Sequence, residues 1–277
     1  MEPLTLHLLG TGGGRHTMCT QRRKTAGIRL EHGETQVHVD PGPGALVHSI
    51  YAGLTPMRLD GVIVTHCHPD HYTDAEVLVE AMTGGTTRRR GVLAAARSVL
   101  RGGDGIDPSI SRYHQGLAGR VEELVPGSRF EVGGLSFEAL RAVHGDDDAI
   151  CLRFEAPGVG ALAYTSDTEA YPGLGEALGG CRLLVLGTMW PRNSPLKGHL
   201  CTDDALRLIG EARPRCAVTT HFGIKLLNVD PVKEAEWLEE NSGVPVVAAE
   251  DGMTVTLDDS VTVKGPRKGD APRVIEA

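Results

Sequence analysis

The stretch THCHPDH at residues 65–71 carries three of the chain's 12 histidines, together with one aspartate. It follows GVIV (61–64), an apolar, β-branched run that predicts a buried strand. Imidazole and carboxylate groups are the ligands that transition metals prefer in proteins. The stretch therefore predicts a metal site directly after a strand.

Short apolar runs alternate along the chain with amphipathic stretches. The stretches 73–82, 202–212 and 230–240 have helical spacing, and each begins with Thr or Asp, which suits a helix N-cap. The apolar runs have the length and composition of strands. The alternation predicts an α/β fold with mixed sheets. The expected strands are residues 4–9, 36–40, 61–66, 91–96, 135–140, 149–156, 161–167, 182–188, 216–221, 245–251 and 253–257.

Four of the expected strands end in, or are closely followed by, a residue type that binds metals. These residues are His66, His144, Asp167 and His221. In α/β proteins the carboxyl ends of strands form the crevice in which ligands bind. We therefore expect the four side chains to converge.

Together with the dense turn, the strand ends supply enough ligands for two ions. His66 and His68 alternate on an extended segment, so they point the same way and can bind one ion. Asp70 and His71 follow Pro69, which bends the chain, and can bind a second ion. The full set of expected metal ligands is His66, His68, Asp70, His71, His144, Asp167 and His221.

The order and spacing of these residues resemble those of the metallo-β-lactamase superfamily of metal-dependent hydrolases. The motif His-x-His-x-Asp-His, followed by one His, one Asp and one His at later strand ends, matches from about residue 4 to residue 257. The resemblance implies a four-layer αββα sandwich of two mixed β-sheets flanked by helices. It also implies that His66, His68 and His144 hold one ion, that Asp70, His71 and His221 hold the other, and that Asp167 bridges them.

Further motifs are similar to the ribonuclease Z and cyclic-nucleotide phosphodiesterase branch of this superfamily. They are LLGTGGG (8–14), TSDT (165–168) and GHLCTDDALRLI (198–209) before TTHFG (219–223). The branch carries an additional histidine before the last metal histidine, and here it is His199. Cleavage of a phosphodiester needs a group that protonates or stabilises the departing alkoxide.

The resemblance leads to a first hypothesis of a phosphodiesterase that acts on a nucleotide, a cyclic nucleotide or an RNA-type phosphodiester. Two divalent ions hold a bridging hydroxide, Asp70 orients it, and His199 acts at the leaving oxygen. Zinc is the favoured metal, with manganese or iron as alternatives. A hydrolase of thioesters, lactones or carboxyl esters could use the same site. A non-catalytic nucleotide-binding module is the third alternative.

The amino-acid composition limits the classes of binding partner and the cellular compartment that we expect for this protein. The net charge of −8 and the pI near 5.8 disfavour RNA as a broad binding partner. The six cysteines form no CxxC pair, and no apolar run is long enough to cross a bilayer, so we expect a cytoplasmic protein without membrane attachment. The N-terminus does not resemble a signal peptide. Relatives form dimers, which makes a homodimer an open possibility.

The chain is expected to form one hydrolase domain over residues 1–263. The glycine-rich segment 84–119 predicts a surface insertion that shapes the mouth of the active site. The polar segment 264–277 predicts a mobile tail.

Several individual residues allow two interpretations. His199 could act in catalysis, or could cap the helix at 202–212 or bond to Asp203. The loop at residues 12–25 carries His16, Arg22, Arg23 and Lys24 after three glycines. It could hold phosphate beside the metals, or be a solvated loop. Cys67 lies between two expected ligands, but on an extended segment it points away from them.

Overall fold

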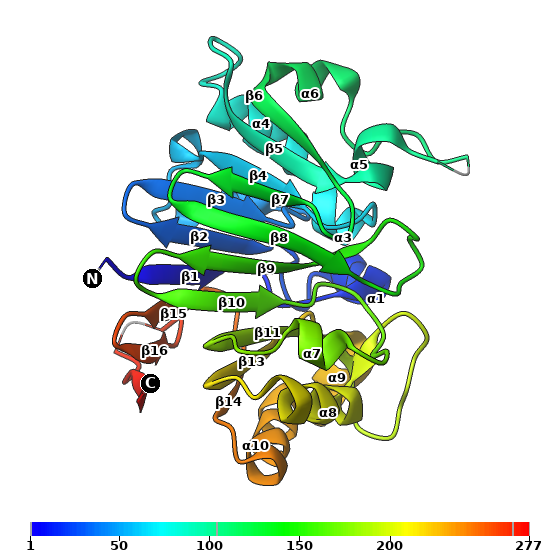
Figure 1. Cartoon of the computed structure of the whole chain (residues 1–277), viewed down its shortest axis with the longest axis vertical. Coiled ribbons are helices and arrows are strands. Elements are labelled where there is room, and N and C mark those ends of the chain that lie inside the picture. The colour runs from blue at the N-terminus through cyan, green and yellow to red at the C-terminus, as the bar shows by residue number, and fades with distance from the viewer. Residues whose placement is uncertain (1, 104, 268, 277) are drawn as a thin grey trace.

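In the computed structural model, which describes residues 2–103, 105–267 and 269–276, two β-sheets pack face to face between helices (Figure 1). The first sheet has the strand order β17-β16-β15-β1-β2-β3-β4-β5-β6, and the second has the order β14-β13-β11-β10-β9-β8-β7, with β12 paired to β11. Both sheets mix parallel and antiparallel pairs. The predicted four-layer αββα sandwich is therefore confirmed.

The elements have the following bounds. The first sheet contains β1 (Leu4–Leu8), β2 (Ile28–His32), β3 (Thr35–Val39), β4 (Gly61–Val64), β5 (Arg90–Ala96), β6 (Ala118–Leu124), β15 (Met253–Leu257), β16 (Ser260–Lys264) and β17 (Arg273–Glu276). The second contains β7 (Arg129–Val132), β8 (Leu135–Arg141), β9 (Ile150–Ala156), β10 (Gly160–Tyr164), β11 (Leu183–Trp190), β12 (Leu200–Cys201), β13 (Cys216–Thr220) and β14 (Val246–Ala248). The helices are α1 (Gly14–Thr20), α2 (Ala45–Tyr51), η1 (Pro56–Arg58), α3 (Pro69–Tyr72), α4 (Ala75–Met82), α5 (Arg97–Arg101), α6 (Arg112–Leu117), α7 (Leu174–Ala177), α8 (Thr202–Ala212), α9 (Ile224–Val229) and α10 (Pro231–Ser242).

The two faces of the first sheet bury different neighbours. In β4, Ile63 belongs to the core between the sheets, whereas Val62 and Val64 belong to a second core beneath the helices. In that second core they are joined by Leu78 and Met82 of α4. Successive side chains of a strand point to opposite faces, so a continuous apolar strand predicts a sheet covered on both sides.

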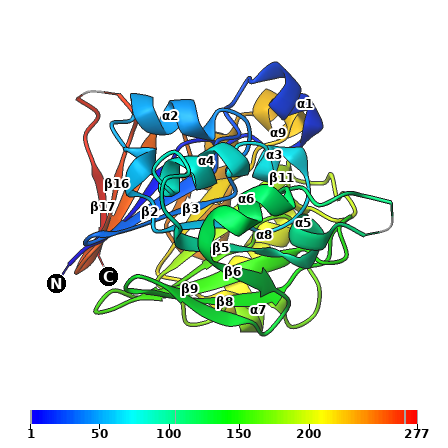
Figure 2. The same cartoon turned by 90° about the horizontal axis from the view of Figure 1, so that it is seen from above.

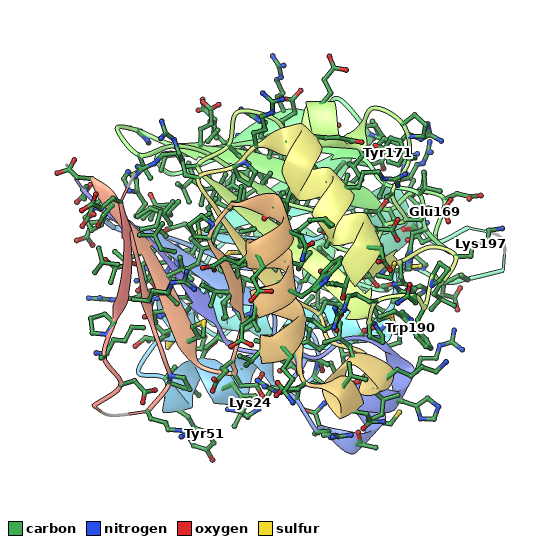
Figure 3. All side chains as sticks on the ribbon, turned by 90° about the horizontal axis from the view of Figure 1, so that it is seen from below. Lys24, Tyr51, Glu169, Tyr171, Trp190 and Lys197 are labelled. Carbon is green, nitrogen blue, oxygen red and sulfur yellow. The ribbon has the colours of Figure 1, made fainter. Side chains whose placement is uncertain are left out.

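Helices cover the outer faces of both sheets. From above, α2 and α4 lie over the first sheet (Figure 2). From below, α8 and α10 lie side by side across the second sheet (Figure 3). In α8, Ala205, Leu208, Ile209 and Ala212 are buried and belong to the same core cluster as the strands of the second sheet. This spacing of three and four residues is the apolar stripe of an amphipathic helix.

Three strands end in a strained backbone where polar residues begin. Asp40 after β3, Ser166 after β10 and His221 after β13 have φ angles of 52°, 49° and 59°. Residues other than glycine rarely adopt this left-handed conformation, and it concentrates at functional sites. Two of these turns lie at strand ends that were expected to carry ligands, since Ser166 precedes Asp167 and His221 is itself an expected ligand, and Asp40 adds a third.

Two expectations about the chain's peripheral segments are wrong in part. Within 84–119, residues 90–96 form β5, which agrees with the strand expected at 91–96; it pairs with β4 and β6 and buries Leu93, so this part of 84–119 is sheet and not insertion. Within 264–277, residues 273–276 form β17 on the edge of the first sheet and bury Ile275. Residues 268 and 277 lie outside the described part. The sheet thus continues beyond the expected domain end at residue 263.

No helix in the described part of the chain is long and apolar enough to cross a membrane.

Candidate metal centre

Four of the seven expected ligands form a first group at the ends of β4 and β10 and in the loop after β8. His68 Nδ1 lies 3.1 Å from His66 Nε2 and 2.9 Å from His144 Nε2. Asp167 Oδ2 lies 3.9 Å from the same atom of His66 and 3.8 Å from that of His144. One ligand atom from each residue falls within 4.8 Å of all the others. This spacing lets all four bind one ion.

The other three residues form a second group beside the first. His71 Nε2 and His221 Nε2 lie 3.0 Å apart, and Asp70 Oδ2 lies 3.4 Å from the latter. Asp167 faces both groups, because its Oδ2 is 3.7 Å from His71 Nε2 and its Oδ1 is 3.1 Å from His221 Nδ1. The two groups therefore adjoin, with Asp167 between them.

Pro69 separates the two groups along the chain. His68 has an extended backbone, with φ −83° and ψ 140°, and Pro69 begins the short helix α3. Proline is favoured at the first position of a helix, where its missing N–H costs no hydrogen bond. The change from strand to helix turns His71 toward His221, with which it shares the second group, although the rings of His66 and His71 stay adjacent, with centroids 4.1 Å apart.

The donor set fits divalent cations. Imidazole nitrogens that face each other at about 3 Å direct lone pairs into a shared space, which a metal ion can occupy. Two buried atoms of the set, Asp167 Oδ1 and His221 Nδ1, have no hydrogen-bond partner among the described residues. Burial alone would lower the pKa of His71, but Asp40, Asp167 and Asp70 raise it to about 10. The carboxylates thus favour a cation at this position.

Asp40 supports both groups, although the sequence analysis did not single it out. Its Oδ1 accepts a hydrogen bond from the backbone N–H of Thr65, directly before His66. Its Oδ2 accepts from Nδ1 of His71 at 3.0 Å and from the hydroxyl of Tyr164 at 3.1 Å. Such outer partners fix the ring orientation of a ligating histidine. The feature of the sequence that could have identified Asp40 is its position directly after the strand β3.

Asp146 joins the two loops of the first group. Its Oδ2 accepts hydrogen bonds from the backbone N–H of Cys67 at 2.9 Å and from the Ser98 hydroxyl at 2.6 Å. The side chain of Cys67 packs against the helix-side core, as expected. His144 Nδ1 also lies 2.6 Å from the carbonyl oxygen of Gly198, an acceptor. These hydrogen bonds fix the position of His144 relative to the His66–His68 segment.

The glycine run at residues 12–14 packs against the second group. The N–H of Gly14 donates to Asp70 Oδ2 at 2.7 Å. A Cβ atom on Gly13 would lie only 2.2 Å from His221 Nδ1. The run is therefore needed for close approach of backbone to ligands. It leads into helix α1, so residues 14–20 are helical and not part of the predicted loop at 12–25.

His199 lies at the rim of the first group. Its Nδ1 is 3.5 Å from Asp167 Oδ2, and its ring centroid is 4.8 Å from that of His144. Asp203 accepts a hydrogen bond from the N–H of Asn193 instead, so the expected alternative of a His199–Asp203 bond is absent from the described contacts. Burial lowers the pKa of His199 to about 4, against the opposing effect of Asp167. The ring is therefore neutral near pH 7.

Comparison with known proteins identifies the family. The model of the β-lactamase superfamily domain matches residues 35–222. This chain belongs to the metallo-β-lactamase superfamily. An uncharacterized protein of Methanocaldococcus jannaschii is 39% identical over 251 residues, which cover 90% of this chain and 93% of that protein. A ribonuclease Z of Methanopyrus kandleri is 24% identical, over 92% of this chain and 98% of its own. The metallo-β-lactamase fold protein YhfI of Bacillus subtilis has a TM-score of 0.75 at 18% identity, over 92% and 100% of the two chains.

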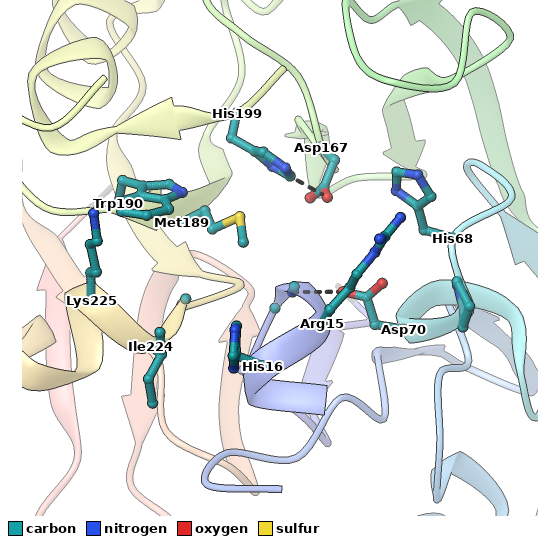
Figure 4. A pocket seen from close by; sticks show the side chains of 14 residues that line it. Arg15, His16, His68, Asp70, Asp167, Met189, Trp190, His199, Ile224 and Lys225 are labelled. Atoms are coloured by element: carbon teal, nitrogen blue, oxygen red, sulfur yellow. Dashed lines mark hydrogen bonds and ion pairs between the residues drawn. The ribbon is translucent and has the colours of Figure 1, made fainter. Parts of the chain in front are cut away.

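In this member of the superfamily, a pocket of about 540 Å³ opens onto both ligand groups (Figure 4). Asp70, Asp167, His68 and His199 line one part of it. The other lining residues are Pro69 of α3 and residues at the start of α1, the end of β11 and the start of α9: Gly13, Gly14, Arg15, His16, Met189, Trp190, Gly223, Ile224 and Lys225. No described residue of 84–119 is among them, so the expectation that this segment shapes the mouth is wrong for this pocket.

The cations of the 12–25 segment divide between the pocket and the surface. Arg15 and His16 line the pocket, whereas Arg22, Arg23 and Lys24 do not. Arg22 binds the side chain of Asn228. The alternative that Arg22, Arg23 and Lys24 hold phosphate is therefore wrong for this pocket, because they follow the end of α1 at Thr20, whereas Arg15 and His16 lie at its start.

Proposed function

We propose that this metal-dependent hydrolase is a phosphodiesterase with two divalent ions. The observation that carries the proposal is the position of His199, which adjoins Asp167 and lines the same pocket as both ligand groups. A proton donor or hydrogen-bond donor beside the ions is what an alkoxide leaving group requires. An ester or thioester with a good leaving group has less need of one.

In this proposal the two groups hold one ion each. His66, His68 and His144 hold the first, Asp70, His71 and His221 hold the second, and Asp167 bridges them. When bound, the ions supply an activated water at neutral pH and stabilise negative charge on the phosphoryl oxygens. Imidazole-rich sites with carboxylates suit zinc, and manganese or iron are the alternatives.

The chain's own residues orient the reacting groups. Asp70 is fixed by the N–H of Gly14 and by His221, so its carboxylate is held in place to accept a hydrogen bond from the attacking water. His199 faces the pocket as a neutral imidazole, so its ring N–H donates a hydrogen bond that stabilises negative charge on the leaving oxygen. The buried surroundings strengthen both interactions.

The ribonuclease Z relative supports phosphorus chemistry, because that protein's name denotes a nuclease. The substrate proposed here is smaller than a folded RNA. The pocket volume of about 540 Å³ suits one small ligand, and the net charge of −8 opposes broad binding of a polyanion. A cytoplasmic location and a homodimer stay predictions.

The test is turnover of bis(p-nitrophenyl) phosphate by zinc- or manganese-loaded protein, beside an Asp70→Ala variant purified identically. Metal-dependent turnover that the variant loses supports the proposal. If the wild type binds two ions and hydrolyses carboxyl esters or thioesters but no phosphodiester, the proposal is wrong and the ester hydrolase takes its place.

A further inference from the structure

The pocket has two chemically different ends. Arg15 extends from α1 toward His68 and Asp70, whereas Trp190 and Lys225 lie at the opposite end (Figure 4). His199 and Asp167 lie between the two ends in the same view. If a phosphodiester binds at the candidate metal centre with its leaving oxygen toward His199, the leaving group extends toward Trp190. The phosphoryl oxygens then lie beside Arg15.

Two cations at the pocket have no carboxylate partner. Neither Arg15 nor Lys225 forms an ion pair with any described residue. The acidic residues of the lining are Asp70 and Asp167, which both belong to the candidate metal centre. Arginine is suited to phosphate because its planar guanidinium can donate two hydrogen bonds to two oxygens of one group.

Trp190 offers a ring and a free donor to a ligand. It is half-buried at the end of β11, and its Nε1–H is buried without a hydrogen-bond partner among the described residues. The Nζ atom of Lys225, an exposed side chain, lies 4.1 Å from the ring centroid. The face of the indole ring is thus covered by the flexible side chain of Lys225 and not by a core residue. Met189 and Ile224 add apolar surface to the same pocket.

We infer that the substrate is a small nucleotide phosphodiester, with the base of the leaving nucleoside stacked on Trp190 and the phosphoryl oxygens bound by Arg15. The inference rests on the proposed phosphodiesterase function and specifies its substrate. Bases stack on aromatic side chains with little dependence on sequence, and arginine or lysine contributes beside them. A buried indole N–H gains an acceptor from the base or the sugar.

Binding of two ligands to metal-loaded protein separates the two ends. Adenosine 5′-monophosphate and ribose 5-phosphate share the phosphate and the sugar, and only the first carries a base. We expect the first to bind about tenfold more tightly, because stacking of one base contributes that much or more. Trp190→Ala should remove this preference and leave the affinity for ribose 5-phosphate unchanged, which also shows that the variant is folded.

Arg15→Gln should weaken both ligands by the same factor, about tenfold, because its contact is to the phosphate that they share. Arg22→Gln is the matched control, since Arg22 belongs to the same segment but binds Asn228 away from the pocket. A second readout is fluorescence. The chain has two tryptophans, so in a Trp237→Phe background Trp190 alone should be quenched by the base and not by ribose 5-phosphate.

The same preparations are assayed on bis(p-nitrophenyl) phosphate, which keeps the two proposals apart. Equal affinities for the two ligands, or a base preference that survives Trp190→Ala, would overturn the inference even if the protein is a phosphodiesterase. A base preference lost in Trp190→Ala supports nucleotide recognition at this end of the pocket. Absence of phosphodiester turnover with two ions bound would reject the phosphodiesterase proposal and, with it, the catalytic part of the inference.

Discussion

Asp40 accepts a hydrogen bond from Nδ1 of His71 at 3.0 Å, and this bond presents the opposite ring nitrogen, Nε2, to the second ligand group. The same carboxylate also accepts from Thr65 and Tyr164. All of these partners donate, so an ionised carboxylate satisfies them where a side chain with one acceptor atom cannot.

Asp40→Asn is expected to weaken metal binding without unfolding the protein. Asparagine can still accept from the N–H of Thr65, but its amide nitrogen then faces the donors around Oδ2, including His71. Loss of such a partner typically costs about 10- to 100-fold in metal affinity. Competition with a chromogenic chelator would measure both binding constants, with Glu239→Gln on the surface as control. Unchanged constants would show that Asp40 does not orient His71 in the bound state.

Gly13→Ala should displace His221 and reduce bound metal. A Cβ atom at this position would lie 2.2 Å from His221 Nδ1, and the backbone of Gly13 is extended, with φ −145°, so the clash and not the conformation causes the effect. Gly210→Ala in α8 is the matched control, because nothing lies within 4 Å of its added methyl. Metal analysis after dialysis should give fewer ions per chain for Gly13→Ala than for Gly210→Ala. Equal contents would mean that the glycine loop moves aside freely.

The candidate ligands could be predicted because each belongs to a local pattern. His66 to His71 lie on one turn, and His144, Asp167 and His221 each follow an apolar strand, so both the residue type and its place are visible in the sequence. Asp40 has the same place after a strand. It was missed because a lone aspartate at a strand end is common in turns, and its hydrogen bond to His71 depends on tertiary contact.

The peripheral segments show where local pattern fails. The glycine run at 12–14, whose last residue begins α1, lowers the helix propensity there, yet the helix is held by contacts such as that of buried Thr17 with the carbonyl of Phe222. The strand β17 depends on the edge that β16 offers, which polar composition does not reveal. Trp190 ends β11 as the expected ligands end their strands, but its role as a pocket wall became visible only with α9 in place.

His38 should make the protein less stable in acid. Burial and the nearby charge of Arg29 lower its pKa from 6.5 to about 3 in the folded state. Between these values the unfolded chain binds a proton at this position and the folded chain does not. The contribution of His38 to the free energy of unfolding is therefore complete above pH 6.5. It decreases as the pH falls toward 3, by about 1.4 kcal/mol per pH unit.

The measurement is the free energy of unfolding in urea across pH 3 to 7, on metal-free protein so that release of metal does not contribute. His38→Gln can keep a hydrogen bond to the carbonyl of Ala26 but does not titrate. Its stability should depend less steeply on pH than that of the wild type in this window. Parallel curves would show that His38 is not the neutral buried group described.

His199 should matter most when the leaving group is poor. A p-nitrophenolate departs without a proton, whereas a nucleoside alkoxide needs a donor at the leaving oxygen. His199→Ala is therefore expected to lower kcat about 100-fold or more on a dinucleotide or cyclic nucleotide, and much less on bis(p-nitrophenyl) phosphate. His48→Ala, on α2 and outside the lining of the pocket, serves as the control. Metal content must stay at the wild-type value, because His199 lies 3.5 Å from Asp167 and could act through it. If both substrates slow equally with metal retained, His199 positions Asp167 and is not the donor to the leaving group.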